Sequence, residues 1–130
     1  MKRFVTLAAA MILTASAAHA ASMMKSVPAS SKTVSDWYKQ DVYDPSNHSI
    51  GKIDDVLVSE GGQISALVIG VGGFLGVGEK DVAVPFSAVR RTIKDKKNYL
   101  TLNTTKDELK SAQGLKYDSD KTAWIADKTK

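Results

Sequence analysis

The chain has 130 residues, with 18 lysines and arginines against 14 aspartates and glutamates, so its formal net charge is +4. This length suits one domain with a modest core. The sequence contains no cysteine, which excludes a disulfide scaffold and a lipid anchor on an N-terminal cysteine. The small net charge gives little support for a polyanionic partner such as nucleic acid.

The first 20 residues, "MKRFVTLAAAMILTASAAHA", have the layout of a secretory signal peptide. Lys2 and Arg3 precede an apolar, alanine-rich run, and Ala18-His19-Ala20 matches an A-x-A cleavage pattern. The run is too short for a bilayer-spanning helix, which needs about 20 apolar residues. We therefore expect cleavage after Ala20 and a periplasmic mature protein. The loss of two cations would lower the net charge from +4 to +2.

The segment after the signal is predicted to be a flexible leader, residues 21–35, because it is rich in serine, alanine and lysine without periodicity. An apolar cluster at residues 37–43 begins the domain. Residues 49–59 alternate as a strand, and the turn at 60–62 contains two glycines that suit a hairpin. Residues 63–71, "QISALVIGV", are apolar on both faces and predict a central strand.

The next strands are also short. "KDVAVPF", residues 80–86, alternates until Pro85, which removes a backbone donor and ends the ladder or places it at an edge. Residues 88–94 and 98–103 predict another hairpin, turning at 95–98. Five or six short strands joined by turns favour an all-β fold, a small barrel or rolled sheet.

The periodicity then changes to that of a short helix within residues 104–114. Thr105 and Glu108 form a capping-box pattern, and Gly114 is a candidate C-terminal cap. The remaining tail to residue 130 is mostly polar, with Tyr117 and Trp124 as candidate anchors.

Two stretches resemble the PRC-barrel domain: "QDVYDPSNHSIGKIDDVLVSEGGQISALVIGVGG", residues 40–73, and "GGFLGVGEKDVAVPFSAV", residues 72–89. This domain occurs in the reaction-centre H subunit and in a ribosome-maturation factor. The similarity spans about residues 37–103 and departs from the family at Asn47-His48, where a glycine is more frequent. It implies a small PRC-type barrel that acts as a non-catalytic adaptor, with no active site or cofactor to transfer.

The glycine-rich segment after the central strand could be mistaken for a phosphate-binding loop. Glu79 stands where such a loop needs lysine, and a strand follows where a helix is required. The glycines are therefore interpreted as structural, allowing sharp bends at a barrel corner. They are Gly51, Gly70, Gly72, Gly73, Gly76 and Gly78. Phe74 and Leu75 within the loop either plug one end of the barrel, the favoured alternative, or project toward a partner.

A basic cluster lies in the predicted hairpin at residues 90–97 and is a candidate partner contact. It comprises Arg90, Arg91, Lys94, Lys96 and Lys97, with Asp95 among them. Arg90 and Arg91 are adjacent in a strand, so their side chains should lie on opposite faces. The favoured interpretation is a solvated hairpin whose lysines discourage edge-to-edge aggregation.

Residues suited to catalysis or metal binding are sparse. His48 is the one histidine left after cleavage and sits in a turn. Asp54 and Asp55 are adjacent in a strand and should point to opposite faces, so they cannot act as a pair on one substrate. Asp118 and Asp120 lack the glycine and glutamate of a calcium-binding loop. No catalytic, cofactor or metal site is predicted, and the protein is not expected to be an enzyme.

The sequence thus predicts a signal peptide at 1–20, a leader at 21–35, a barrel at 36–103, and a helix with a polar tail at 104–130. The expected function is an exported binding or structural module that docks on a protein. One alternative is a binder of membrane surfaces or anionic polymers through Phe74, Leu75 and the basic hairpin. A small envelope enzyme is a weaker alternative. Nucleic acid is not an expected partner, and self-association is left open.

Overall fold

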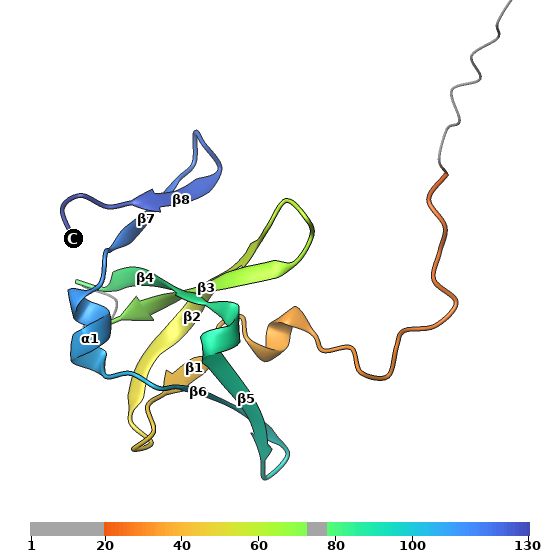
Figure 1. The fold of residues 1–130 in the computed structure, drawn as a ribbon, viewed down its shortest axis with the longest axis horizontal. Helices are drawn as coiled ribbons and strands as arrows, with labels where there is room; N and C mark the ends of the chain where they lie inside the picture. Colours follow the sequence, from red (N-terminus) through yellow and green to blue (C-terminus); the bar gives the residue numbers. More distant parts are fainter. Residues whose placement is uncertain (1–19, 73–77) are drawn as a thin grey trace, which may run out of the picture. The chain divides into compact units, whose positions relative to one another are not determined.

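The computed structural model describes residues 20–72 and 78–130. The chain divides into two units, residues 1–31 and 32–130. In the first unit, the described residues 20–31 are exposed and contain no helix or strand. The second unit contains the elements labelled in Figure 1. None of the helices in the described ranges is long and apolar enough to cross a membrane.

One sheet of eight strands, in the order β5-β6-β1-β2-β3-β4-β7-β8, forms the second unit (Figure 1). Neighbouring strands are antiparallel except β1 and β6, which are parallel. The strands are β1 (Asp41–Tyr43), β2 (Ser49–Val58), β3 (Ile64–Val71), β4 (Lys80–Pro85), β5 (Val89–Lys94), β6 (Lys97–Leu102), β7 (Leu115–Asp118) and β8 (Ala123–Ala126). Two 3-10 turns, η1 (Val34–Asp36) and η2 (Phe86–Ala88), and one helix, α1 (Lys106–Ser111), complete it. The all-β class with a short helix is confirmed.

Strand β3 lies in the middle of the sheet, as its two apolar faces predict. Residues 67–71 of this strand are all buried, and β3 pairs with β2 on one side and β4 on the other. The β2–β3 turn contains Gly62 at φ +81°, a conformation that favours glycine. The β3–β4 connection joins two antiparallel strands, so the glycine-rich segment leads into a hairpin partner. A strand, β4, follows this segment, whereas a phosphate-binding loop is followed by a helix.

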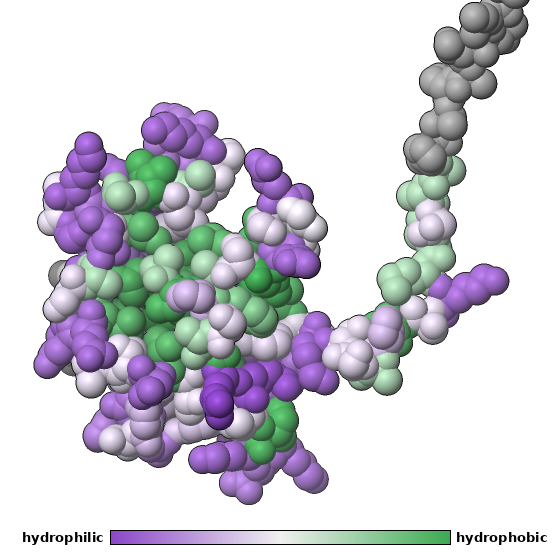
Figure 2. Space-filling model, in the orientation of Figure 1, coloured by the Kyte–Doolittle hydropathy of each residue, from purple (hydrophilic) through white to green (hydrophobic). Residues whose placement is uncertain are grey.

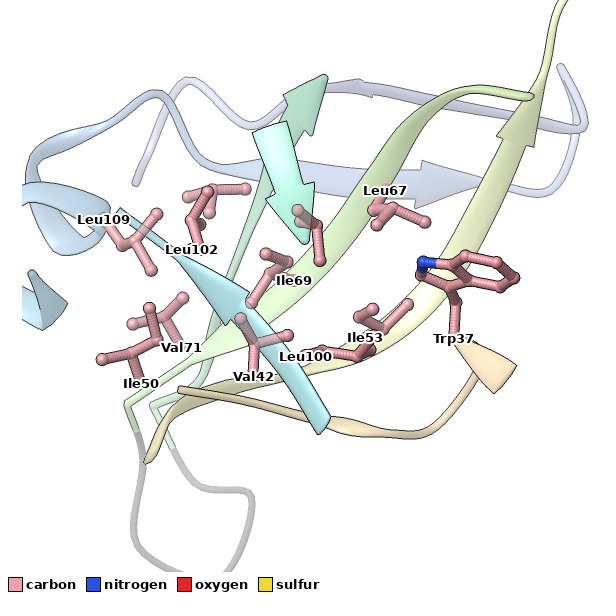
Figure 3. Packing of buried hydrophobic residues seen from close by; sticks show 12 residues of the cluster. Trp37, Val42, Ile50, Ile53, Leu67, Ile69, Val71, Leu100, Leu102 and Leu109 are labelled. Carbon is pink, nitrogen blue, oxygen red and sulfur yellow. The ribbon is translucent and has the colours of Figure 1, made fainter. Parts of the chain in front are cut away.

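The core is formed by apolar side chains that point toward one another from the strands, from α1 and from the residue after η1 (Figure 3). Trp37, which follows η1, packs its ring 5.2 Å from that of Phe86. Figure 2 shows apolar residues near the middle of the viewed face, with hydrophilic residues around them. The buried cluster comprises Trp37, Val42, Ile50, Ile53, Leu67, Ile69, Val71, Val82, Val89, Leu100, Leu102 and Leu109.

Helix α1 begins with the predicted capping box. The Glu108 amide donates to Thr105 Oγ1 at 3.1 Å, and the Thr105 amide donates to Glu108 Oε2 at 3.2 Å. The prediction of Gly114 as the C-cap is wrong. The helix ends at Ser111 because Ala112 adopts an extended conformation that leads toward β7. Gly114 instead lies close to the C-terminus, where an added Cβ would approach Lys130 Cβ to 2.8 Å.

Replacing Thr105 with alanine should destabilise the protein by about 1 kcal/mol, because it removes the side-chain acceptor for the Glu108 amide. Urea unfolding measures the loss. Lys106→Ala, in the exposed first turn of the same helix, is the control and should change stability by less than about 0.5 kcal/mol. Equal stability of the two variants would contradict a stabilising cap.

The tail beyond α1 contains a hairpin, β7–β8, where the sequence indicated only polar residues with two anchors. It joins the sheet through the pairing of Leu115 with Asp81 in β4. The indole Nε1 of Trp124 donates to Asp55 Oδ2 at 2.7 Å, a bond between β8 and β2. Tyr117 packs edge-on against Trp124 with 5.7 Å between ring centroids. Trp124 therefore anchors the hairpin, whereas Tyr117 remains 53% exposed.

Trp124→Phe should loosen this hairpin, because phenylalanine keeps an aromatic ring but cannot donate to Asp55. We expect backbone amides of β7 and β8 to exchange with deuterium roughly fivefold faster, the effect of losing about 1 kcal/mol of hydrogen bonding. Amides of β3 are the internal control and should exchange at the wild-type rate. Unchanged exchange in the hairpin would show that the indole bond does not hold it.

Candidate functional site

Strand β5 places its basic residues on two different faces. Arg90 pairs with Thr101 and Thr92 with Tyr99 in the β5–β6 register, so Arg90, Thr92 and Lys94 share one face. Arg91 lies on the other face, where its guanidinium contacts Asp36 at 2.9 Å and lies 5.6 Å from the Trp37 ring. This separation follows from strand alternation. The contacts with Asp36 and Trp37 connect Arg91 to the N-terminal part of the barrel.

The β5–β6 turn fixes this register. Lys94 pairs with Lys97, which leaves Asp95 and Lys96 as a two-residue loop. Both loop residues have positive φ, +49° and +65°. That combination is typical of the type I′ turn, whose twist matches that of a hairpin.

A pocket of about 520 Å³ opens on the Arg90 face of this hairpin. Arg90, Lys94 and Tyr99 contribute side chains from β5 and β6. Asp44 lines it from the turn after β1, and Ser87 and Asn103 add polar groups. We call this site the tyrosine pocket.

The Tyr99 side chain is held by aromatic and cationic neighbours in the tyrosine pocket. Its ring stacks on Tyr43 at 4.7 Å with an interplanar angle of 8°, and Lys94 Nζ lies 4.6 Å from its centroid, a cation–π arrangement. Its hydroxyl oxygen is buried and has no hydrogen-bond partner within residues 20–72 and 78–130. Burial raises the pKa of this hydroxyl, and the neighbouring Tyr43 and Asp44 raise it further. The hydroxyl therefore stays protonated and can donate.

Asp44 supplies a negative charge to the same pocket. Its carboxylate accepts the backbone N–H of His48 at 2.9 Å and lies 3.3 Å from His48 Nδ1. The backbone hydrogen bond is the main cause that lowers the pKa of Asp44. His48 itself is 78% exposed. It closes the turn after β1, which agrees with its interpretation as a solvated turn residue.

Three carboxylates gather at a second place, although the sequence analysis proposed no such group. Oxygen atoms of Asp54, Glu79 and Asp81 all lie within 4.8 Å of one another; we call these residues the carboxylate cluster. Asp54 is the extra residue of a bulge in β2, where Ile53 pairs with Ile69 and Asp55 with Val68. Asp55 instead bonds Trp124, so the adjacent aspartates do have separate partners.

Gly70 makes the carboxylate cluster sterically feasible. It pairs with Lys52 on one side and Asp81 on the other, and a Cβ at this position would collide with the Glu79 and Asp54 carboxylates. Strand register together with this glycine is the signal that could have predicted the cluster.

Crowding changes the acidity of the carboxylate cluster. Burial, followed by the proximity of Asp54, raises the pKa of Asp81 to about 7. The same causes raise the pKa of Glu79. Lys39 Nζ lies 4.0 Å from Asp54, and the positive charges of Lys52 and Lys130 oppose the upward shifts. Carboxylate oxygens are ligands that hard cations prefer, but the nearby lysines compete for the same negative charge.

The other predicted site residues are distributed around the sheet. Gly72 and Gly78 have φ of +75° and +77°, conformations that favour glycine. Lys96 and Lys97 lie at and beside the β5–β6 turn and are exposed. Residues 73–77 of the glycine-rich segment lie outside the described residues, and four of them, Gly73, Phe74, Leu75 and Gly76, are predicted site residues.

Comparison with known proteins identifies the family. The sequence model described as the PRC-barrel domain matches residues 31–109. The matched region contains β1 to β6 and most of α1, whereas β7 and β8 lie beyond it. No curated protein matches the chain. Because the family match spans more than half of its 130 residues, the chain belongs to the PRC-barrel family.

Proposed function

We propose that this PRC-barrel protein is an exported, non-catalytic module of the periplasm that docks on a protein partner through the tyrosine pocket. The observation that carries the proposal is the pairing of basic and aromatic groups there. Arg90 and Lys94 have no carboxylate within 4.0 Å in the described part of the chain, and they adjoin the stacked rings of Tyr43 and Tyr99. Arginine and tyrosine are enriched in protein interfaces.

The hydrogen-bond partners of the carboxylate cluster support a non-catalytic role. The carboxylate cluster contains a group with a pKa near neutrality, which a general acid or base requires. Within the described ranges, however, its carboxylates share no hydrogen bond with a serine, histidine or tyrosine side chain. Nucleophilic catalysis needs such a pair. We therefore propose that the cluster performs no chemistry on a substrate.

Export is tested by the N-terminus of the protein made in its bacterial host. Mass spectrometry should find a chain that begins at Ala21, in the periplasmic fraction, because Ala18-His19-Ala20 matches a cleavage pattern. An intact chain beginning at Met1 in the cytoplasmic fraction would contradict export.

Docking is tested by site-specific photo-crosslinking in the periplasm. A benzoylphenylalanine at Thr92, which is exposed on the Arg90 face, should give one discrete crosslinked protein. The same group at Lys121, exposed in the β7–β8 turn, is the matched control and should not capture that protein. Absence of any crosslink at Thr92, or equal capture at both positions, would contradict docking through this face.

A further inference from the structure

We propose that the tyrosine pocket binds the carboxylate of an acidic residue in an extended segment of the partner, together with a backbone N–H beside it. This inference rests on the proposed docking function and specifies the chemistry of the partner. It draws on three features of the pocket: two cations, a buried donor and a fixed carboxylate.

The cations provide the attraction. Arg90 and Lys94 lie four residues apart on one face of β5, so both side chains reach the same pocket. The ring of Tyr99 holds the Lys94 ammonium 4.6 Å from its centroid, which limits the freedom this group would lose on binding. Arg91, by contrast, already pairs with Asp36 at 2.9 Å. Arg90 and Lys94 are thus the cations of this strand that are available to a ligand.

The Tyr99 hydroxyl provides a directed hydrogen bond. A buried hydroxyl without a partner is unfavourable, and this one has none among the described residues. The oxygen is closed to solvent in the free protein, so a carboxylate entering between Arg90 and Lys94 would accept from this hydroxyl once the Tyr99 ring turns toward it.

Asp44 decides which kind of anion fits. Hydrogen bonds from His48 keep its carboxylate in place, and this negative charge on the pocket wall repels a phosphate dianion or a densely charged polymer. It favours a ligand that carries a hydrogen-bond donor next to its acid. A peptide offers this combination, because each acidic side chain adjoins backbone N–H groups. A volume of about 520 Å³ accommodates such a side chain with its backbone.

Binding can be measured by NMR on the mature protein, with a blocked peptide of alternating glycine and glutamate as the probe. The backbone amides of Arg90, Lys94 and Tyr99 should shift in a saturable manner. The same peptide with glutamine in place of glutamate should not shift them. Inorganic phosphate and vesicles containing phosphatidylglycerol are the competing anions, and neither should displace the peptide at equal charge concentration. Displacement by either, or equal shifts with the glutamine peptide, would overturn the proposal.

Variants locate the peptide within the pocket. Arg90→Gln and Lys94→Gln should each weaken peptide binding roughly tenfold, and Tyr99→Phe, which keeps the stacked ring, roughly fivefold. Lys121→Gln removes one exposed cation outside the pocket and should leave the affinity unchanged. Equal weakening by all four variants would indicate non-specific charge attraction and overturn the proposal. An unaltered amide spectrum elsewhere in the barrel verifies that each variant is folded.

The two proposals can fail separately. If Arg90→Gln leaves crosslinking at Thr92 intact and the peptide does not bind, docking stands and the carboxylate pocket is wrong. If the wild-type protein captures nothing at Thr92, docking through this face is wrong. Loss of the Thr92 crosslink in Arg90→Gln and Lys94→Gln, with peptide binding in solution, supports both.

Discussion

Asp81→Asn should stabilise the protein at neutral pH and flatten the dependence of its stability on pH. The folded-state pKa of Asp81 is raised to about 7 from an ordinary value of 3.8. Between these values the folded protein binds the proton more tightly than the unfolded chain does. The free energy of unfolding of the wild type is therefore highest below pH 4 with respect to this group, and falls as the pH rises to about 7.

The size of the effect follows from the same difference. After a discount for partial solvent screening, the free energy of unfolding falls by about 1–2 kcal/mol as the pH rises from about 4 to about 7. Asparagine avoids the loss because it carries no charge beside Asp54 and Glu79. Lys39, Lys52 and Lys130 face the cluster and reduce the repulsion without cancelling it.

Urea unfolding of wild type and Asp81→Asn at pH 4.5, 6 and 7.5 measures this dependence. The two proteins should differ most at pH 7.5. Asp120→Asn, a change at an exposed aspartate outside the carboxylate cluster, is the control and should retain the wild-type slope. A slope in Asp81→Asn equal to that of the wild type would show that Asp81 does not titrate as described.

Gly51→Ala should destabilise the barrel by about 2–3 kcal/mol, a cost typical of overpacking. An added Cβ would lie 2.6 Å from Ile69 Cγ2 and 2.7 Å from the Gly70 carbonyl oxygen. Ile69 is fully buried in the central strand, and the carbonyl belongs to backbone that pairs on both sides. Neither neighbour can move away without disturbing the β2–β3 ladder.

Gly61→Ala is the matched control for this substitution. Position 61 lies in the β2–β3 turn, where the nearest atom to an added Cβ is Ser59 Oγ at 3.9 Å. Its stability should stay within about 0.5 kcal/mol of the wild type. Thermal unfolding of both variants distinguishes a crowded glycine from a merely flexible one. Equal midpoints would contradict the close packing of β2 on β3.

Local pattern was sufficient for much of the fold. Alternation located β2, β4, β5 and β6, and the two apolar faces of residues 63–71 identified the central strand. The capping box at Thr105 predicted the start of α1. These features depend on residues close together in sequence, where propensity and periodicity act directly.

Features that depend on distant residues were not predictable in this way. Hairpin β7–β8 is held by the bond between Trp124 and Asp55, 69 residues apart, and its strands have only four residues each. The tyrosine pocket requires the parallel pairing of β1 with β6, which brings Tyr43 to Tyr99. The carboxylate cluster requires the bulge at Asp54 and a glycine at position 70, where a Cβ would collide with the carboxylates. Each depends on register, which composition does not reveal.

The attachment of β7–β8 makes this hairpin a natural grafting position for protein engineering. It lies beyond the matched domain and joins the sheet through the Asp81–Leu115 pairing and the Trp124–Asp55 bond. A replacement hairpin that preserves Leu115 and Trp124 would alter the exposed surface. The hydrogen bonds among the strands from β1 to β6 would stay as they are. The barrel can in this sense serve as a scaffold with an exchangeable C-terminal cassette.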